Sequence, residues 1–182
     1  MQFSVGDKIV HPLYGAGQIT AMEHRELVKG FEHYYVVKLL VQDSTLYIPV
    51  RKMEELGVRA VMSLAKLDHV LDVLQGVPSS LSQDYKERQG RIQEQIGTGR
   101  PLRIAEAIRD LNWHRQLKRL TKKDEDLLEK GQDFLASEIA MATDLDIPEA
   151  HQMINTALDV ALSQDLDESE YAQAPSATTK LA

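Results

Sequence analysis

The stretch that decides the fold is residues 3–19, which read FSVGDKIVHPLYGAGQI. Within it, Lys8–His11 is a short apolar run typical of a strand. Pro12 ends that run, because proline cannot donate a hydrogen bond to a strand ladder. Residues 12–17, PLYGAG, form a turn cluster whose two glycines can adopt positive φ angles. The stretch therefore predicts short strands joined by a tight turn.

The strand pattern continues to about residue 50. The dipeptide 29–30, Lys-Gly, indicates a hairpin, and residues 33–41 are rich in Tyr, Val and Leu, as expected of a buried strand. Residues 45–48 form the next strand, which Pro49 ends. Several short strands at close spacing predict a small, strongly bent β-barrel, and we assign it residues 1–55.

From about residue 61 the apolar period becomes helical. Thr121 with Asp124 resembles a capping box, and Asp146 with Glu149 indicates the start of a last helix. The fold class is therefore α+β, with a helical domain at 56–164 and a polar, disordered tail at 165–182. The apolar positions that support helices are Leu64, Leu67, Val70, Leu71, Leu74, Ile104, Ala105, Ile108, Leu111, Leu128, Leu135, Ile139, Met153, Ile154, Ala157, Leu158 and Ala161.

Charge is distributed unevenly along the chain. The net charge is −7, yet residues 80–123 carry 11 basic and 5 acidic side chains, whereas residues 124–170 carry 1 basic and 14 acidic ones. A basic segment inside an acidic protein can be the electrostatic footprint of a nucleic-acid contact, and it can equally be a solvated helix face. The charge pattern alone leaves both interpretations open.

Most sites of chemistry are not indicated by the sequence. The chain has no cysteine, and its six histidines show none of the short spacings of helical metal sites. No phosphate loop, nucleophile elbow or carboxylate pair in an apolar setting is evident. We therefore expect a non-enzymatic protein without cofactor or metal. No apolar run approaches the length of a membrane span and no signal peptide is evident, so we expect a cytoplasmic location.

The basic segment contains one informative cluster. Tyr85, Lys86, Arg88 and Arg91 lie within two helical turns, and Tyr85 and Arg88 share a face at a spacing of i, i+3. Cations can contact phosphates while the aromatic ring packs on bases or sugars. The alternative is that Tyr85 packs in the helical core. The four residues form our predicted DNA-binding set.

Residues 3–19 resemble the opening of the CarD/CdnL family, whose members begin with the pattern V/I-G-D-x-V-V-Y-P-x-x-G-x-G-x-I. The resemblance continues to about residue 160. It includes Tyr34–Lys38, Ile48-Pro49, Leu56–Arg59, Arg88, Gly99, Ala105-Glu106, Arg109–Leu111 and Leu120-Thr121. Shorter relatives of the N-terminal part occur in transcription–repair coupling factors.

The resemblance implies a Tudor-like barrel that binds the β subunit of RNA polymerase, and a helical domain that contacts promoter DNA at the upstream edge of the bubble. The implied function is bacterial transcription regulation through stabilisation of the open promoter complex. Arg25 matches a basic position that family members use against polymerase. The predicted polymerase-binding set is Arg25, Tyr47, Ile48 and Pro49.

This sequence departs from the family at several of these positions. Tyr47 stands where many members have Arg, and Tyr85 stands where the family usually has a wedge Trp. Gly90 and Glu125 replace commonly basic residues. A second interpretation is therefore an adaptor that binds polymerase or another protein and whose DNA contact is weakened. In either case we expect a monomer with no membrane partner and with weak, non-specific DNA binding.

Overall fold

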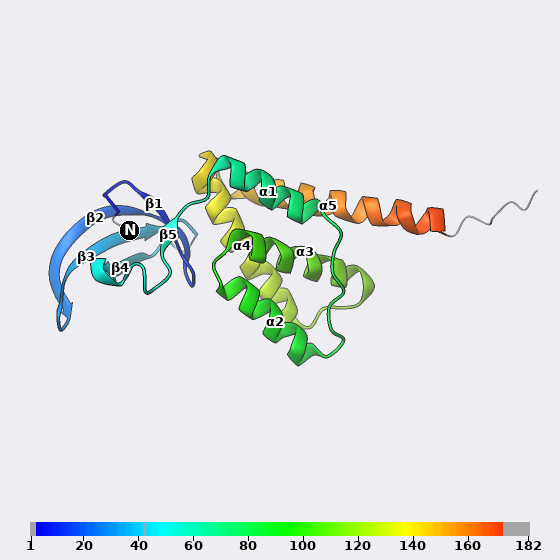
Figure 1. Cartoon of the computed structure of the whole chain (residues 1–182), viewed down its shortest axis with the longest axis horizontal. Coiled ribbons are helices and arrows are strands. Elements are labelled where there is room, and N and C mark those ends of the chain that lie inside the picture. Colours follow the sequence, from blue (N-terminus) through cyan, green and yellow to red (C-terminus); the bar gives the residue numbers. More distant parts are fainter. Residues whose placement is uncertain (1–2, 42, 173–182) are drawn as a thin grey trace, which may run out of the picture.

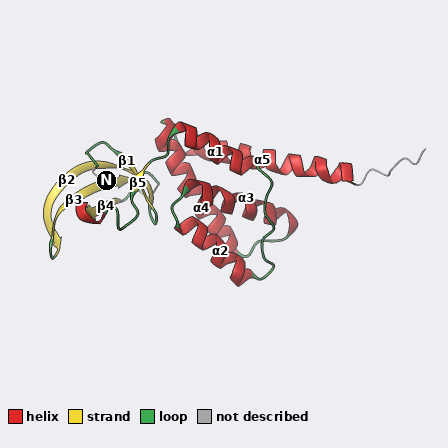
Figure 2. Ribbon diagram, viewed as in Figure 1, coloured by secondary structure: helices red, strands yellow, loops and turns green. Residues whose placement is uncertain are grey.

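The computed structural model describes residues 3–41 and 43–172, and it has a β-rich N-terminal part followed by helices (Figures 1 and 2). The α+β class predicted from the sequence is confirmed. The strands are β1 (Lys8–His11), β2 (Gly15–Val28), β3 (Phe31–Leu39), β4 (Thr45–Pro49) and β5 (Arg59–Ala60), with a 3₁₀ turn at Val50–Lys52. The helices are α1 (Leu64–Gln75), α2 (Tyr85–Gly97), α3 (Pro101–Leu117), α4 (Lys122–Thr143) and α5 (Ile147–Ala172).

The five strands form one antiparallel sheet in the order β4-β3-β2-β1-β5. The predicted turn at 12–17 is shorter than expected, because β2 already begins at Gly15, which pairs with His11. Gly15 takes a positive φ of 86°, as predicted for the turn. Gly17 is required for another reason: a Cβ there would lie 2.7 Å from the carbonyl oxygen of Lys38. The strongly bent β2 and β3 therefore pack backbone against backbone at this point.

The sheet extends beyond the predicted boundary at residue 55. Val58 is buried in the barrel core, and β5 pairs with β1 through Ile9 and Val10. At the other end of the chain, α5 continues to Ala172, so residues 165–172 of the predicted tail are helical. No Gly or Pro lies between Pro148 and Pro175 to end the helix. Residues 173–182 of the predicted tail lie outside the described residues.

Helix starts agree with the sequence signals. Thr121 Oγ1 accepts from the backbone N–H of Asp124, and the Asp124 carboxylate accepts from the backbone N–H of Thr121, which completes a capping box. Asp146 and Glu149 make the same reciprocal exchange at the start of α5. These caps satisfy N–H groups that have no partner within the helix.

The barrel and the helices share part of one apolar core. Val10 and Ala16 belong to strands, yet they pack with the helical core rather than with the barrel core. The backbone N–H of Ala16 also donates to Ser137 Oγ on α4 at 3.3 Å. Figure 1 shows α4 running from the far end of the helical part to the barrel. The two parts are therefore joined by packing and not only by the connecting chain.

A buried ion pair reinforces this joint. Arg59 of β5 donates to both carboxylate oxygens of Glu138 on α4, with the longer of the two contacts at 2.7 Å. Glu138 is fully buried and also accepts from the backbone N–H of Met62. Arg59 further donates to the carbonyl of Gly99, at 2.6 Å from its second terminal nitrogen. One guanidinium thus connects the sheet, α4 and the α2–α3 turn.

Candidate partner-binding and nucleic-acid-binding surfaces

The outer face of β2, β3 and β4 brings together two residues of the predicted polymerase-binding set. The Arg25 guanidinium carbon lies 5.5 Å from the ring centroid of Tyr47, a cation–π distance. Arg25 Nε also lies 2.6 Å from the carboxylate of Glu23. The Arg25 side chain is 52% exposed and Tyr47 is 40% exposed. An oriented cation and an aromatic ring are therefore accessible to a partner on one surface.

The other two residues of that set lie differently. Ile48 is 3% exposed and packs in the barrel core, because side chains alternate along β4 and Tyr47 takes the outward position. Pro49 is half-buried at the end of β4. The Ile48 side chain is therefore not available to a partner, and the prediction needs correction there. β4 is an edge strand of the sheet, so its backbone can pair with an incoming strand.

The predicted DNA-binding set clusters at the start of α2. Tyr85 is the first residue of this helix and is 53% exposed, so it is not part of the core. Lys86 and Arg91 are also exposed. Asp84 caps the helix by accepting from the backbone N–H of Lys86 at 2.7 Å. The alternative in which Tyr85 is a core residue is excluded by this exposure.

Arg88 is the exception in this set. It is 5% exposed, and its guanidinium donates to both carboxylate oxygens of Asp124 on α4, at 3.2 and 2.7 Å. It also donates to the carbonyl of Ser82 at 2.9 Å. Burial alone would raise the pKa of Asp124, but hydrogen bonds from Arg88 and Thr121 outweigh it and hold that pKa below its ordinary value. Arg88 is thus engaged inside the protein, which corrects its assignment as a direct DNA contact.

Three helix ends meet around Tyr85. Gln89 of α2 donates to Thr121 Oγ1 at the start of α4 at 2.9 Å. Lys118, just after α3, donates to Gln83, just before α2. These contacts place the cations that follow α3 and open α4 beside the start of α2. The exposed cations of this end, which we call the basic end, are Lys86, Lys118, Arg119, Lys122 and Lys123.

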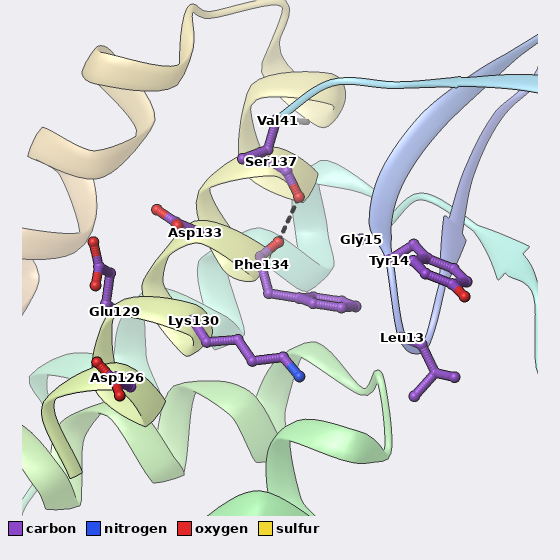
Figure 3. A pocket seen from close by; sticks show the side chains of 10 residues that line it. All are labelled: Leu13, Tyr14, Gly15, Val41, Asp126, Glu129, Lys130, Asp133, Phe134 and Ser137. Carbon is purple, nitrogen blue, oxygen red and sulfur yellow. Dashed lines mark hydrogen bonds between the residues drawn. The ribbon is translucent and has the colours of Figure 1, made fainter. Parts of the chain in front are cut away.

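Acidic side chains reduce the positive charge of the basic end. Lys122 pairs with Asp126 at 2.8 Å, and this hydrogen bond raises the pKa of the lysine. Further along α4 a cavity of about 220 Å³ opens between the helix and the barrel (Figure 3). Its helical side is lined by Asp126, Glu129 and Asp133 together with Lys130, Phe134 and Ser137. Asp126 and the carboxylates that follow it on α4 therefore limit the positive surface along this helix, although Lys130 also lines the cavity.

Two segments of the chain match models of known protein families. Residues 3–62 match the model described as CarD-like/TRCF RID domain, and residues 69–155 match the model described as CarD, C-terminal domain. The chain belongs to the CarD family. It is 31% identical over 137 residues to "Putative transcription factor YdeB" of Bacillus subtilis (strain 168), an alignment that covers 75% of this chain and 90% of that protein.

CarD-family membership identifies the chain as a regulator of transcription whose N-terminal domain is of the polymerase-interacting type. The family is one of regulators and not of enzymes. None of the described helices is long and apolar enough to cross a membrane. Within the CarD C-terminal match, sequence reasoning missed Lys122 and Lys123 as part of the candidate surface. Their closeness to Tyr85 depends on the buried contacts of Arg88 and Gln89, which residue spacing does not reveal.

Proposed function

We propose that this protein stabilises the open promoter complex by holding RNA polymerase with its barrel and promoter DNA with its basic end. The observation that carries the proposal is the exposed ring of Tyr85 at the point where cations from three helix ends converge. Cations can bind phosphates on either side while the ring stacks at a distorted base step.

The polymerase half of the proposal rests on the outer face of the barrel. Arg25 and Tyr47 form a pre-oriented pair, and the adjacent β4 offers an outer strand for pairing. Strand addition supplies affinity through main-chain hydrogen bonds, while side chains beside it supply specificity. We assign the β subunit as the partner, as the CarD/CdnL resemblance implies.

The DNA half rests on geometry and charge. Tyr85 is 53% exposed, whereas Arg88 and Gln89, one turn further along the same helix face, are buried. A protruding ring can insert beside an unstacked base step at the upstream edge of the bubble and offset part of the unstacking cost, a few kcal/mol. Lys86 and the cations of α4 then supply the phosphate contacts that orient the ring.

The shared core gives the two halves a fixed relative position. Arg59, Glu138 and the packing of Val10 against the helices hold the barrel to the helical part. Once the barrel binds polymerase, the basic end is presented to DNA at a high effective concentration. Weak intrinsic DNA affinity is then sufficient for function.

A second candidate function is an adaptor that binds polymerase and a further protein. The observation that favours it is the cavity of Figure 3 between the barrel and α4, where carboxylates of α4 lie beside Lys130 and the apolar side chains of Leu13, Val41 and Phe134. Such a mixed lining suits a protein segment that has both apolar and charged side chains better than it suits the uniformly anionic backbone of DNA. The two candidate functions differ in whether Tyr85 and the neighbouring lysines are needed for activity: the first function requires them to contact DNA, and the adaptor function does not.

The lifetime of open complexes formed with purified cognate polymerase tests the proposal. Complexes are assembled with and without the protein, a competitor is added, and the remaining fraction is followed over time. The proposal expects a longer lifetime with the protein. An unchanged lifetime, together with normal binding to polymerase, would reject DNA stabilisation and favour the adaptor.

A further inference from the structure

We propose that His24, Glu32 and His33 form a binding site for a divalent transition-metal ion, with zinc as the ion of choice, at the β2–β3 hairpin. One potential ligand atom from each of the three side chains lies within 4.8 Å of the others. The proposal is independent of the function proposed above. It revises the expectation from sequence that the chain has no metal site.

The antiparallel register creates the histidine pair. His24 of β2 lies directly opposite His33 of β3, and their ring centroids are 4.9 Å apart in an edge-to-face arrangement. Directly opposite residues have Cβ atoms about 4.5–5.5 Å apart, so both imidazoles can reach one ion. The two histidines are nine positions apart in sequence, and for this reason helical metal-site spacings do not detect them.

Glu32 supplies the third ligand of the proposed site. The register between β2 and β3 shifts between His24 and Val28, where β2 carries extra residues opposite Glu32. Across this irregular stretch the carboxylate comes close to both rings. Zinc is bound by imidazole nitrogen at about 2.0–2.1 Å and by carboxylate oxygen at about 2.0–2.2 Å, which brings tetrahedral ligands to about 3.3 Å from each other. Small rotations of these exposed side chains close the difference from 4.8 Å.

The three side chains are free to bind. Across residues 3–41 and 43–163 none of the three makes a side-chain hydrogen bond or ion pair, and all three are exposed. Two imidazoles and one carboxylate suit zinc, and they leave a fourth position for water or a partner's side chain. A cavity of about 380 Å³ lined by Glu32 and His33 provides room for that ligand.

The site lies on the opposite face of the hairpin from the polymerase-binding candidates. Arg25 pairs with Glu23, two residues earlier on β2, and lies over Tyr47, whereas His24 faces His33. Side chains of adjacent strand residues such as Glu23 and His24 point to opposite faces. A bound ion would connect β2 to β3 next to Arg25 without covering it. We therefore infer that the ion stiffens the hairpin that carries this cation.

Calorimetric titration of the full-length, tag-free, chelator-treated protein with zinc chloride tests the site. We expect saturable binding of one ion per chain at micromolar concentration. His24→Ala and His33→Ala should each weaken binding at least about tenfold, and Glu32→Gln should weaken it less. His69→Ala, which removes an exposed histidine of α1, is the matched control and should bind as the parent does.

Arg51 provides a test of opposite sign. It lines the same cavity and carries a positive charge that opposes a cation there, so Arg51→Met should tighten zinc binding several-fold at low salt. Cobalt in place of zinc should give the intense visible bands of four-coordinate cobalt, and these should vanish in His33→Ala. Circular dichroism verifies that each variant is folded. Absence of saturable binding, or binding that survives both histidine substitutions, would overturn the proposal.

Discussion

The Arg88 guanidinium lies 2.7 Å from the Asp124 carboxylate, and this buried pair fastens the start of α2 to the start of α4, about one helical turn after Tyr85. Asp124 has a second task, because it also completes the capping box with Thr121. The pair therefore fixes both the helix that carries the aromatic ring and the helix that carries Lys122 and Lys123. Arg88 serves the candidate DNA surface as a positioning residue.

Removing one partner of the pair should be costly. Arg88→Ala leaves the Asp124 carboxylate buried without its cation, and we expect the free energy of unfolding to fall by about 3–5 kcal/mol. The control Arg91→Ala removes an exposed cation of the same helix and should change it by less than about 0.5 kcal/mol. Urea unfolding of the three proteins makes the comparison. Equal stability of the parent and Arg88→Ala would refute the positioning role.

Tyr85→Ala should shorten the open-complex lifetime several-fold or more, because a stacking ring is worth about 1–3 kcal/mol per base. Since Tyr85 is exposed, the melting temperature of the free protein should change by only about 1–2 °C. Tyr85→Trp, which offers a larger ring, should match or lengthen the lifetime. A large loss of melting temperature with an unchanged lifetime would remove Tyr85 from the functional surface.

Arg25→Glu should weaken binding of the full-length protein to the polymerase β subunit by about 1–3 kcal/mol, the scale of a lost interfacial charge contact. The substitution also removes the cation that lies over Tyr47 and places a second carboxylate beside Glu23. Lys29→Glu reverses an exposed charge of the same hairpin and is the matched control. Equal loss of binding in the two variants would indicate a general charge effect and argue against a specific Arg25 contact.

DNA binding by the free protein should be weak and strongly dependent on salt. The basic end can neutralise about 3–5 phosphates, which gives a log–log slope of about −3 to −4 for affinity against salt concentration. Replacing Lys122 and Lys123 together by alanine should make that slope shallower by about 1–2. Lys29→Ala, on the barrel hairpin, should leave it unchanged. Fluorescence anisotropy at several salt concentrations provides the slopes, and tight, salt-insensitive binding would contradict this prediction.

Mild acid should destabilise the protein through His114. Burial, followed by the positive charge of Arg88, lowers the pKa of this histidine below its ordinary value of 6.5. The unfolded chain takes up a proton near that value while the folded chain does not. Stability is therefore lost as pH falls from about 6.5 toward the folded pKa, and the loss levels off below it. Urea unfolding between neutral pH and about pH 5 should show a smaller decline for His114→Gln than for the parent, with His69→Gln resembling the parent.

The fold was largely predictable because local signals agree with the structure. The reciprocal exchange of Thr121 and Asp124 at the start of α4 is visible in the sequence, and so is that of Asp146 and Glu149. The ends of β1 and β4, at Pro12 and Pro49, could also be predicted from the sequence. β5 was missed because a two-residue strand carries no periodicity, and it forms only through its pairing with β1.

The candidate sites were less predictable, because a charged residue in a basic segment is ordinarily exposed. Arg88 is buried only because Asp124, 36 residues away, provides a partner. Ile48 follows the alternation of β4, which could have been counted once Tyr47 was assigned to the surface. The pairing of His24 with His33 depends on the hairpin register, and a register is not determined by composition.

The Arg59–Glu138 ion pair gives the molecule a fixed length between its two candidate binding surfaces. Because this pair and the surrounding core fix the barrel relative to α4, the span from Arg25 to Tyr85 is set by the fold and not by a flexible linker. Under the proposed function, binding would therefore depend on the distance and angle between polymerase and promoter DNA. The protein would favour the arrangement of polymerase and DNA in which the two binding surfaces are as far apart as its own. Any other arrangement would have to deform before both contacts could form.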